Sequence, residues 1–407
     1  MMQSYIHLVT GNEKYMASLE CKILDNEINI DLSTAKITHC CKMSSFWPIG
    51  DEPIKKNSIS KDIRTSMKKG RWHPYCDACK QDEEKGYTSY RQTNGDTTNV
   101  FDSLNVIIQL PSYCQASCFY CTDHLSSTIA GYGSWVDFQG KLRKTKMPSL
   151  KPKVEIGKIQ DYIASLDPKR NIQLGFVGGE PFITDAFFDY IYPILEAALG
   201  VNPKRTVLIG ATTNSHNRVE YTQRFYELIQ QARDRFKSTI ITDIAVSIEN
   251  IESRAEWSRN LVWQDFITVL DVHLKNANIT HFKPCWNFTC MGKPLGHFLK
   301  FIKDKKASGS LQFNYVNQHH LRPQVLGKTP GSVFTNPTSF FSWLDLNDAQ
   351  RGGFDKFKHW LSTTEDLTHL APLTAKHIYN VDKIRGTDFS KTFPELDYWY
   401  KENLNAL

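Results

Sequence analysis

The alternation of short apolar runs with longer amphipathic stretches is the feature that most constrains the fold of this chain. Six apolar runs follow one another from about residue 103, at 104–110, 172–177, 206–209, 240–248, 281–289 and 311–316. Apolar residues at helical spacing fill segments between them, at 156–165, 186–199, 220–236, 263–275 and 295–303. This pattern predicts an α/β fold with a parallel sheet covered by helices. It leaves a barrel and an open doubly wound sheet as alternatives.

Composition excludes several other classes of protein. The 407 residues are 41% hydrophobic and 23% charged, which is typical of a folded chain of two or three domains. There is no run of about 18 apolar residues that would predict a membrane span, and no pattern of a secretory signal at the start. We therefore expect a cytoplasmic protein without a membrane partner. The net charge of +6 permits an anionic partner without requiring one.

Changes of composition and residue pattern along the sequence predict three domains. Residues 1–100 are polar and rich in turn sequences, with one helical pattern at 59–69, and we expect a small Cys-rich domain there. Residues 101–325 carry the alternating pattern and form the expected core. Residues 326–407 begin with Gly, Pro and Thr and continue as an expected, mostly helical extension.

Three of the ten cysteines lie within eight residues, directly after the first expected strand: Cys114, Cys118 and Cys121. Without a secretory signal, such thiols are expected to stay reduced and to bind metal. Thiolates are soft ligands that suit zinc or iron–sulfur clusters. Structural zinc would need a fourth ligand, whereas a [4Fe–4S] cluster held by three cysteines leaves one iron open. A zinc loop and three unrelated core cysteines remain alternatives at this point.

A second motif, Gly178-Gly179-Glu180-Pro181, follows the next expected strand. Two glycines at a strand end let the backbone approach a ligand closely, and the adjacent carboxylate can accept hydrogen bonds from an amine. Parallel sheets bind ligands at the carboxyl ends of their strands. This motif is therefore a candidate ligand site rather than a plain turn.

Together these motifs resemble those of the radical S-adenosylmethionine (SAM) superfamily. The resemblance rests on the Cys triad, with Tyr120 before its last cysteine, and on the Gly-Gly-Glu-Pro turn. It continues through 211–214, 246–249 and 256–259, and it covers about residues 103–320. It implies a partial (β/α)6 barrel, with Cys114, Cys118 and Cys121 bound to three irons of a [4Fe–4S] cluster and SAM chelating the fourth.

The resemblance also implies which residues hold the amino acid part of SAM. Glu180 and the backbone of Gly178 and Gly179 would hold the amine. Arg259 would pair with the carboxylate, for which a planar guanidinium is well suited, and Arg254 is an alternative for that role.

The nucleoside part of SAM would be bound by other strand ends. Ser247, with Thr212 or Asn214, would reach the ribose hydroxyls, and Tyr120 would border the adenine. Reduction of the cluster would then break a carbon–sulfur bond of SAM and release a 5′-deoxyadenosyl radical that abstracts hydrogen from a substrate.

The amino-terminal cysteines resemble the auxiliary-cluster segment of twitch or SPASM-type radical SAM proteins, although that segment usually follows the barrel. The resemblance implies a second iron–sulfur cluster on four thiolates. One of the adjacent Cys40 and Cys41 would remain free. A zinc ribbon is the alternative. The candidate ligands are Cys21, Cys40, Cys41, Cys76 and Cys79.

The sequence predicts less about the role of two other groups of residues. Cys285 and Cys290 are expected to be buried thiols, although Cys285 lies on a strand that could present every second residue to a substrate. The tail segment 381–396 resembles the close of the same twitch-containing proteins and has no assigned role.

The sequence thus predicts a radical SAM enzyme that modifies a substrate, first of all a peptide or protein side chain. The implied partner is an electron donor such as flavodoxin or ferredoxin. Modification of a nucleotide, nucleic acid or small metabolite is the alternative substrate class. A non-catalytic zinc or iron–sulfur binding module is the alternative of another kind.

Overall fold

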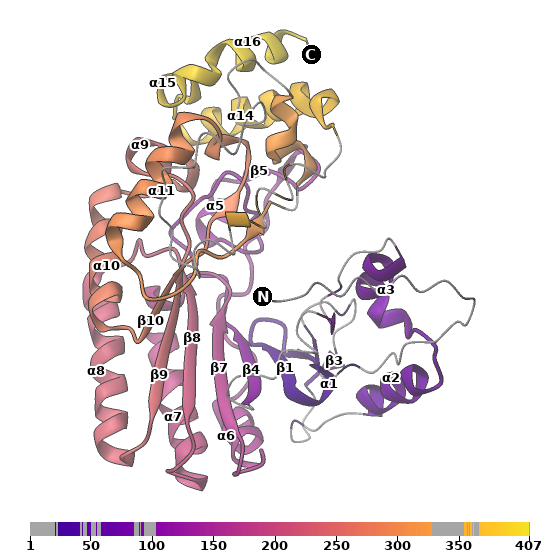
Figure 1. The fold of residues 1–407 in the computed structure, drawn as a ribbon, viewed down its shortest axis with the longest axis vertical. Helices are drawn as coiled ribbons and strands as arrows, with labels where there is room; N and C mark the ends of the chain where they lie inside the picture. Colours follow the sequence, from indigo (N-terminus) through magenta and orange to yellow (C-terminus); the bar gives the residue numbers. More distant parts are fainter. Residues whose placement is uncertain are drawn as a thin grey trace, which may run out of the picture.

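A computed structural model describes residues 21, 23–40, 43, 47–49, 54, 58–84, 89, 91–92, 103–316, 318–327, 354–355, 357, 359, 361 and 366–406. The fold is mixed α/β, built on a large and mostly parallel sheet of eight strands (Figure 1). The strands run in the order β10-β9-β8-β7-β4-β1-β2-β3. This confirms the expected class of fold.

The parallel part of the sheet contains six strands, and β2 and β3 extend it antiparallel. Two small sheets pair β5 (Ser134–Val136) with β6 (Leu142–Lys144), and β11 (Cys285–Trp286) with β12 (Asn314–Tyr315). The strands of the large sheet are β1 (Glu27–Asp31), β2 (Lys36–Thr38), β3 (Trp47–Pro48), β4 (Ser103–Gln109), β7 (Asn171–Val177), β8 (Val207–Thr213), β9 (Ile240–Val246) and β10 (Ile279–Phe282).

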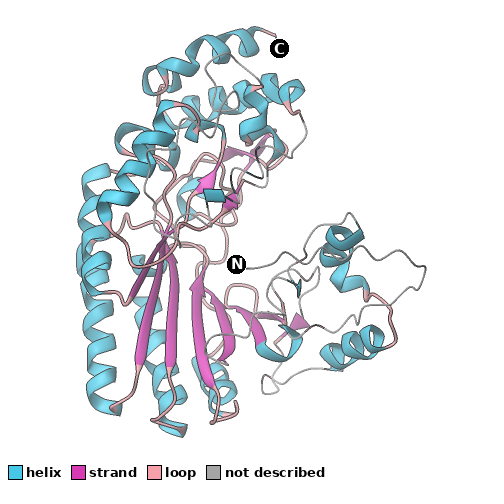
Figure 2. Cartoon of the chain, in the orientation of Figure 1, coloured by secondary structure: helices cyan, strands magenta, loops and turns pink. Residues whose placement is uncertain are grey.

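Helices follow most of the parallel strands and pack on the sheet (Figure 2). Short 3₁₀ turns η1 to η7 lie at Pro74–Cys76, Pro181–Ile183, Phe288–Cys290, His319–Leu321, Pro323–Leu326, Thr368–Leu370 and Pro394–Leu396. The helices are α1 (Ile23–Asn26), α2 (Ser58–Lys68), α3 (Asp77–Glu84), α5 (Ser127–Gly131), α6 (Ile156–Ala164), α7 (Asp185–Val201), α8 (Val219–Phe236), α9 (Glu252–Arg259), α10 (Trp263–Asn276), α11 (Lys293–Lys305), α14 (Ala371–Arg385), α15 (Phe389–Thr392) and α16 (Asp397–Asn405).

The expected strands and helices of residues 103–276 are confirmed, with small shifts at their ends. Farther on, the expected strand 281–289 is divided into β10, β11 and η3. Pro284 lies at the break, and because proline has no backbone N–H it cannot donate to the ladder. The expected strand 311–316 is reduced to the two residues of β12 and a single bridge from Leu311 to Phe282.

The two faces of the large sheet differ in polarity. Burial alternates along β4 and β7, so that Val106 and Leu174 are fully packed in the helix-covered core. The opposite face is half-buried and carries polar or small residues at many positions. Gly175 pairs there with Gly210, and the polar members include Asn105, Gln109, Gln173, Thr212, Asp243, Ser247 and Lys283.

The amino-terminal segment joins the same sheet through β1, whose residues pair in parallel with Asn105–Gln109 of β4. Beyond β1 it has a small core of its own around Ile63 and Met67. The helix expected at 59–69 is α2, and Gly70 follows it with φ +68°. At the other end of the chain, α14 to α16 lie above the upper ends of the strands, near α5 and β5 (Figure 1).

Candidate active site

The Cys triad lies in an irregular loop that follows β4. Cys114 and Cys118 are buried and Cys121 is half-buried, and the three pack in one small cluster with Ala116 and Tyr120. Burial raises the pKa of Cys114, and the neighbouring Cys118 and Cys121 raise it further. Burial also raises the pKa of Cys121 to about 12. The three thiols therefore share one desolvated site, where a bound cation would favour their deprotonation.

The backbone of this loop is held by side chains from elsewhere in the chain. An irregular buried loop needs such partners, because its carbonyl oxygens lack a helix or sheet ladder. Cys114 O accepts from Thr128 Oγ1 at 2.8 Å. The carbonyls of Ala116, Ser117, Phe119, Tyr120 and Cys121 accept from Ser126, Arg385, His377, Gln318 and Trp135, in that order.

The Gly-Gly-Glu-Pro turn packs directly against the entry to the cysteine loop. Gly178 and Gly179 have φ values of +87° and +49°. A Cβ on Gly179 would lie 2.2 Å from the carbonyl oxygen of Tyr113, so no side chain fits there. The nitrogen of Glu180 donates to that same oxygen at 2.6 Å. The glycines thus allow two segments of the chain to approach closely, which joins the two motifs into one structure.

Glu180 is buried, and its carboxylate accepts three hydrogen bonds. Oε1 accepts from Thr213 Oγ1 at 2.7 Å and from the nitrogen of Phe182 at 3.2 Å, while Oε2 accepts from the nitrogen of Asn214 at 2.6 Å. Burial raises the pKa of Glu180 to about 7, against these hydrogen bonds and Arg259. A carboxylate has about four acceptor positions, so one remains for a ligand.

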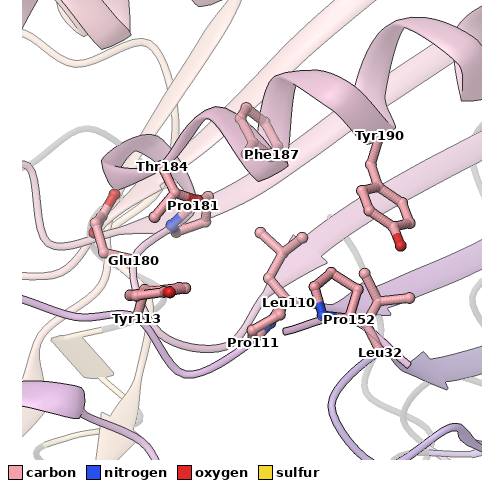
Figure 3. A pocket seen from close by; sticks show the side chains of 10 residues that line it. All are labelled: Leu32, Leu110, Pro111, Tyr113, Pro152, Glu180, Pro181, Thr184, Phe187 and Tyr190. Atoms are coloured by element: carbon pink, nitrogen blue, oxygen red, sulfur yellow. The ribbon is translucent and has the colours of Figure 1, made fainter. Parts of the chain in front are cut away.

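A small pocket of about 10 Å³ lies beside this turn (Figure 3). Leu110, Pro111, Tyr113 and Phe187 contribute to its lining, and Glu180 lies at its edge in the figure. The carboxylate of Glu180 is hydrogen bonded to the end of β8 instead. A pocket of this volume is too small to hold a SAM molecule.

A buried network of charges lies beside Cys118. Arg259 donates to Glu249 Oε2 from Nη2 at 2.5 Å and from Nε at 3.1 Å, and Tyr120 donates to Glu249 Oε1 at 3.0 Å. Burial lowers the pKa of Arg259, but Glu249, Tyr120 and Cys118 raise it above its ordinary value overall. Arg254, by contrast, forms a more exposed double contact with Glu395, outside this network.

Two nitrogen donors reach the sulfur atoms of the triad. Asn214 Nδ2 lies 3.5 Å from Cys114 Sγ, and Arg259 Nη1 lies 3.8 Å from Cys118 Sγ. Donors of this kind stabilise thiolates that bind metal and tune the potential of a cluster. The surroundings of the triad thus fit an anionic, sulfur-bound group. Asn214 also accepts from Gln115 within the loop, at 3.1 Å.

The remaining expected SAM ligands lie on the half-buried side of the strand ends. Thr212 Oγ1 accepts from Lys283 Nζ at 3.3 Å, and the nitrogen of Ser247 donates to Thr213 O at 2.8 Å. Cys285 is half-buried next to this group, and Cys118, Cys121, Glu249 and Arg259 all affect its pKa, which burial raises.

Cys290 is fully buried in the large core, which agrees with the expectation for it.

The amino-terminal cysteines gather at a second place. Cys21, Cys40, Cys76 and Cys79 line one small pocket, together with Arg91. Burial raises the pKa of Cys76 to about 12, and Cys21 and Cys79 raise it too. Cys41 lies outside the described residues.

No three His, Cys, Asp or Glu side chains within the described ranges converge as ligands of a single metal ion. The thiolates of a cluster bind separate irons, so this finding concerns mononuclear sites. Nor does any helix of the described part of the chain have the length and apolar character needed to cross a membrane.

Comparison with known proteins gives no family for this chain: no protein-family model matches it, and no curated protein matches it.

Several residues of the site had no role in the sequence-based prediction. Glu249 directly follows the expected apolar run 240–248, and a carboxylate in that position is a signal that could have been used. Arg385 belongs to the tail segment that the resemblance had noted. Gln318 and His377 show no signal, because their partners lie 198 and 258 residues away in the sequence.

Proposed function

We propose that this protein is a radical SAM enzyme. The observation that carries the proposal is the convergence of three thiols, the Glu180 carboxylate and the Glu249–Arg259 pair at the carboxyl ends of neighbouring parallel strands. Each of these groups is buried or half-buried, and each is fixed by hydrogen bonds or packing. So costly a set of buried polar groups is typical of a functional site.

Cys114, Cys118 and Cys121 would hold three irons of a [4Fe–4S] cluster. When bound, the cluster supplies one electron to SAM, which breaks a carbon–sulfur bond and yields methionine and a 5′-deoxyadenosyl radical. Asn214 and Arg259 donate toward the sulfurs of Cys114 and Cys118, and so stabilise the thiolate forms. The buried loop would keep water from such a cluster.

The same residues position SAM in this proposal. Glu180 offers its remaining acceptor position to the SAM amine. Glu249 accepts from Nε and Nη2 of Arg259, and Nη1 of Arg259 points toward the cysteine triad. One edge of the guanidinium therefore stays available for the SAM carboxylate. Thr212 and Ser247 would reach the ribose, and Tyr120 would border the adenine.

The proposed fold of the core is a partial (β/α)6 barrel. Its strands would be β4, β7, β8, β9 and β10, followed by β11, and its inner surface would be the polar, half-buried face of the sheet. The substrate would bind on that face. Lys283 and Cys285 would contact it, because both are half-buried and Lys283 reaches Thr212 at the end of β8.

The amino-terminal site would hold an auxiliary iron–sulfur cluster on Cys21, Cys40, Cys76 and Cys79. These cysteines come from separated parts of the sequence and line one pocket, which supports a shared ligand. A peptide or protein side chain is the proposed substrate, and a small electron-transfer protein such as flavodoxin or ferredoxin is the proposed reductant.

The test is anaerobic reconstitution with iron and sulfide, reduction in the presence of SAM, and detection of 5′-deoxyadenosine. We expect the product from the wild-type protein and none above background from Cys118→Ala. The matched control is Cys290→Ala, which removes a buried core thiol outside the site and should still give the product.

The iron content separates the two ligand sets. Cys118→Ala should keep the amino-terminal iron, and Cys76→Ala should lose it. Product formation by Cys118→Ala would refute the assignment of the triad. A wild-type protein that takes up zinc alone and leaves SAM intact would instead favour a binding module.

A further inference from the structure

The carboxyl-terminal helix α14 ends against the cysteine loop. Arg385, its last residue, donates from Nη1 to the carbonyl oxygen of Trp257 at 2.5 Å and from Nη2 to that of Ser117, which lies between Cys114 and Cys118. The sequence separation between Arg385 and Ser117 is 268 residues. The tail segment therefore closes on the proposed cluster site rather than on a remote surface.

A second residue of α14 holds another carbonyl of the loop, that of Phe119. His377 Nε2 lies 2.7 Å from the oxygen of Phe119 and must donate its proton, because a carbonyl only accepts. Its Nδ1 then accepts from His320 Nε2 at 3.1 Å. Burial lowers the pKa of His377 to about 3 and that of His320 to about 4, so both rings are neutral at pH 7.

Arg385 brings a buried positive charge to this place. Its guanidinium lies over the rings of Trp135 and Trp257, at 5.4 Å and 5.8 Å from their centroids. Within the described part of the chain, its hydrogen bonds go to two carbonyl oxygens. Asp382 on the same helix is engaged by Trp257 Nε1 at 2.7 Å and by the nitrogen of Phe389.

Arg385 brings its charge next to Cys118, because the carbonyl oxygen that accepts from its Nη2 belongs to Ser117, the residue before Cys118. Cys118 packs in one small cluster with Cys114 and Cys121. The other cation next to Cys118, Arg259, is already balanced by Glu249. The positive charge of Arg385 is thus less neutralised than that of Arg259.

We infer that Arg385 is a positioning residue of the cluster site, which fixes the cysteine loop and supplies a counter-charge for the anionic group bound by Cys118. This inference rests on the proposed function. Each added electron makes a thiolate-bound cluster more negative, so a buried cation beside it stabilises the reduced state. Arg385 should therefore raise the reduction potential of this cluster.

The test is a redox titration of the reconstituted full chain, followed by electron paramagnetic resonance, with iron counted per chain. We expect Arg385→Gln to lower the ratio of reduced to oxidised cluster about tenfold at a fixed potential, which is about 59 mV for one electron. Arg385→Lys keeps the charge and should stay near the wild-type value. The control is Arg233→Gln, since Arg233 also donates to a carbonyl, that of Ile240, far from the triad.

The outcomes separate this inference from the proposed function. A wild-type chain that binds no cluster at the triad overturns both. A loaded Arg385→Gln variant with the potential of Arg233→Gln overturns the inference alone. If Arg385→Gln binds no iron, the Arg385→Lys variant is used instead. Full iron and a wild-type potential in Arg385→Lys would support the inferred counter-charge. A tenfold change in its ratio of reduced to oxidised cluster would contradict it.

Discussion

Glu249 has the least exposed carboxylate at the candidate site, and it balances the charge of Arg259. Its side chain is 0% exposed and that of Arg259 is 5% exposed. Both of its oxygens are used, one by Arg259 and one by Tyr120. A pair buried to this degree is expensive to break, because the remaining partner is left as an uncompensated charge.

We therefore expect Glu249→Gln to lower the free energy of unfolding by about 3 kcal/mol or more. Denaturant titration of the chain measures it. The matched control is Glu395→Gln, which removes the same charge from the more exposed pair with Arg254, and there we expect less than about 1 kcal/mol. Equal losses in the two variants would show that the Glu249–Arg259 pair is no more than an ordinary surface contact.

At the scale of elements, the contact between α8 and α10 depends on a neutral histidine. His273 on α10 forms a hydrogen bond of 2.9 Å with Tyr226 on α8, and it packs on the ring of Phe182, the residue after the Gly-Gly-Glu-Pro turn. Burial lowers the pKa of His273 to about 3. This histidine therefore connects the packing of two helices to the turn that carries Glu180.

The lowered pKa of His273 predicts a pH dependence of stability. His273 takes up a proton near pH 6.5 in the unfolded chain but not in the folded chain. The contribution of neutral His273 to the free energy of unfolding is therefore complete well above pH 6.5 and is lost as the pH falls toward 3. Between pH 6.5 and 5.5 the wild type should lose about 1 kcal/mol relative to His273→Gln, because half of the unfolded histidine is already protonated at pH 6.5. Urea titrations at both pH values measure this, with the exposed His369→Gln as control. A constant difference between wild type and His273→Gln would contradict it.

The elements also show what the sequence could predict. The strands and helices of residues 103–276 follow from apolar periodicity, because burial on one sheet face or one helix stripe produces that period. The break at Pro284 was missed because an apolar run says nothing of the hydrogen bonds that proline removes. The pairing of β1 with β4 was missed as well, since it joins residues 78 positions apart, such as Glu27 and Asn105, with no local signal.

At the scale of the whole molecule, three regions meet on one sheet. The amino-terminal cysteines are linked to it through β1, the triad follows β4, and α14 holds the triad loop from the carboxyl-terminal side. Spacing and resemblance predicted the triad and the turn of Gly178 to Pro181. They could not predict Arg385 or Gln318 as partners of the loop, because these contacts depend on how distant parts of the chain close over it.

The central claim is that Cys114, Cys118 and Cys121 hold a cluster with one iron open to SAM. Electron paramagnetic resonance of the reduced, iron-loaded chain with and without SAM tests it most directly. The account predicts a signal that SAM changes in the wild type and that is missing in Cys118→Ala. A spectrum that ignores SAM, together with unchanged iron in Cys118→Ala, would contradict it.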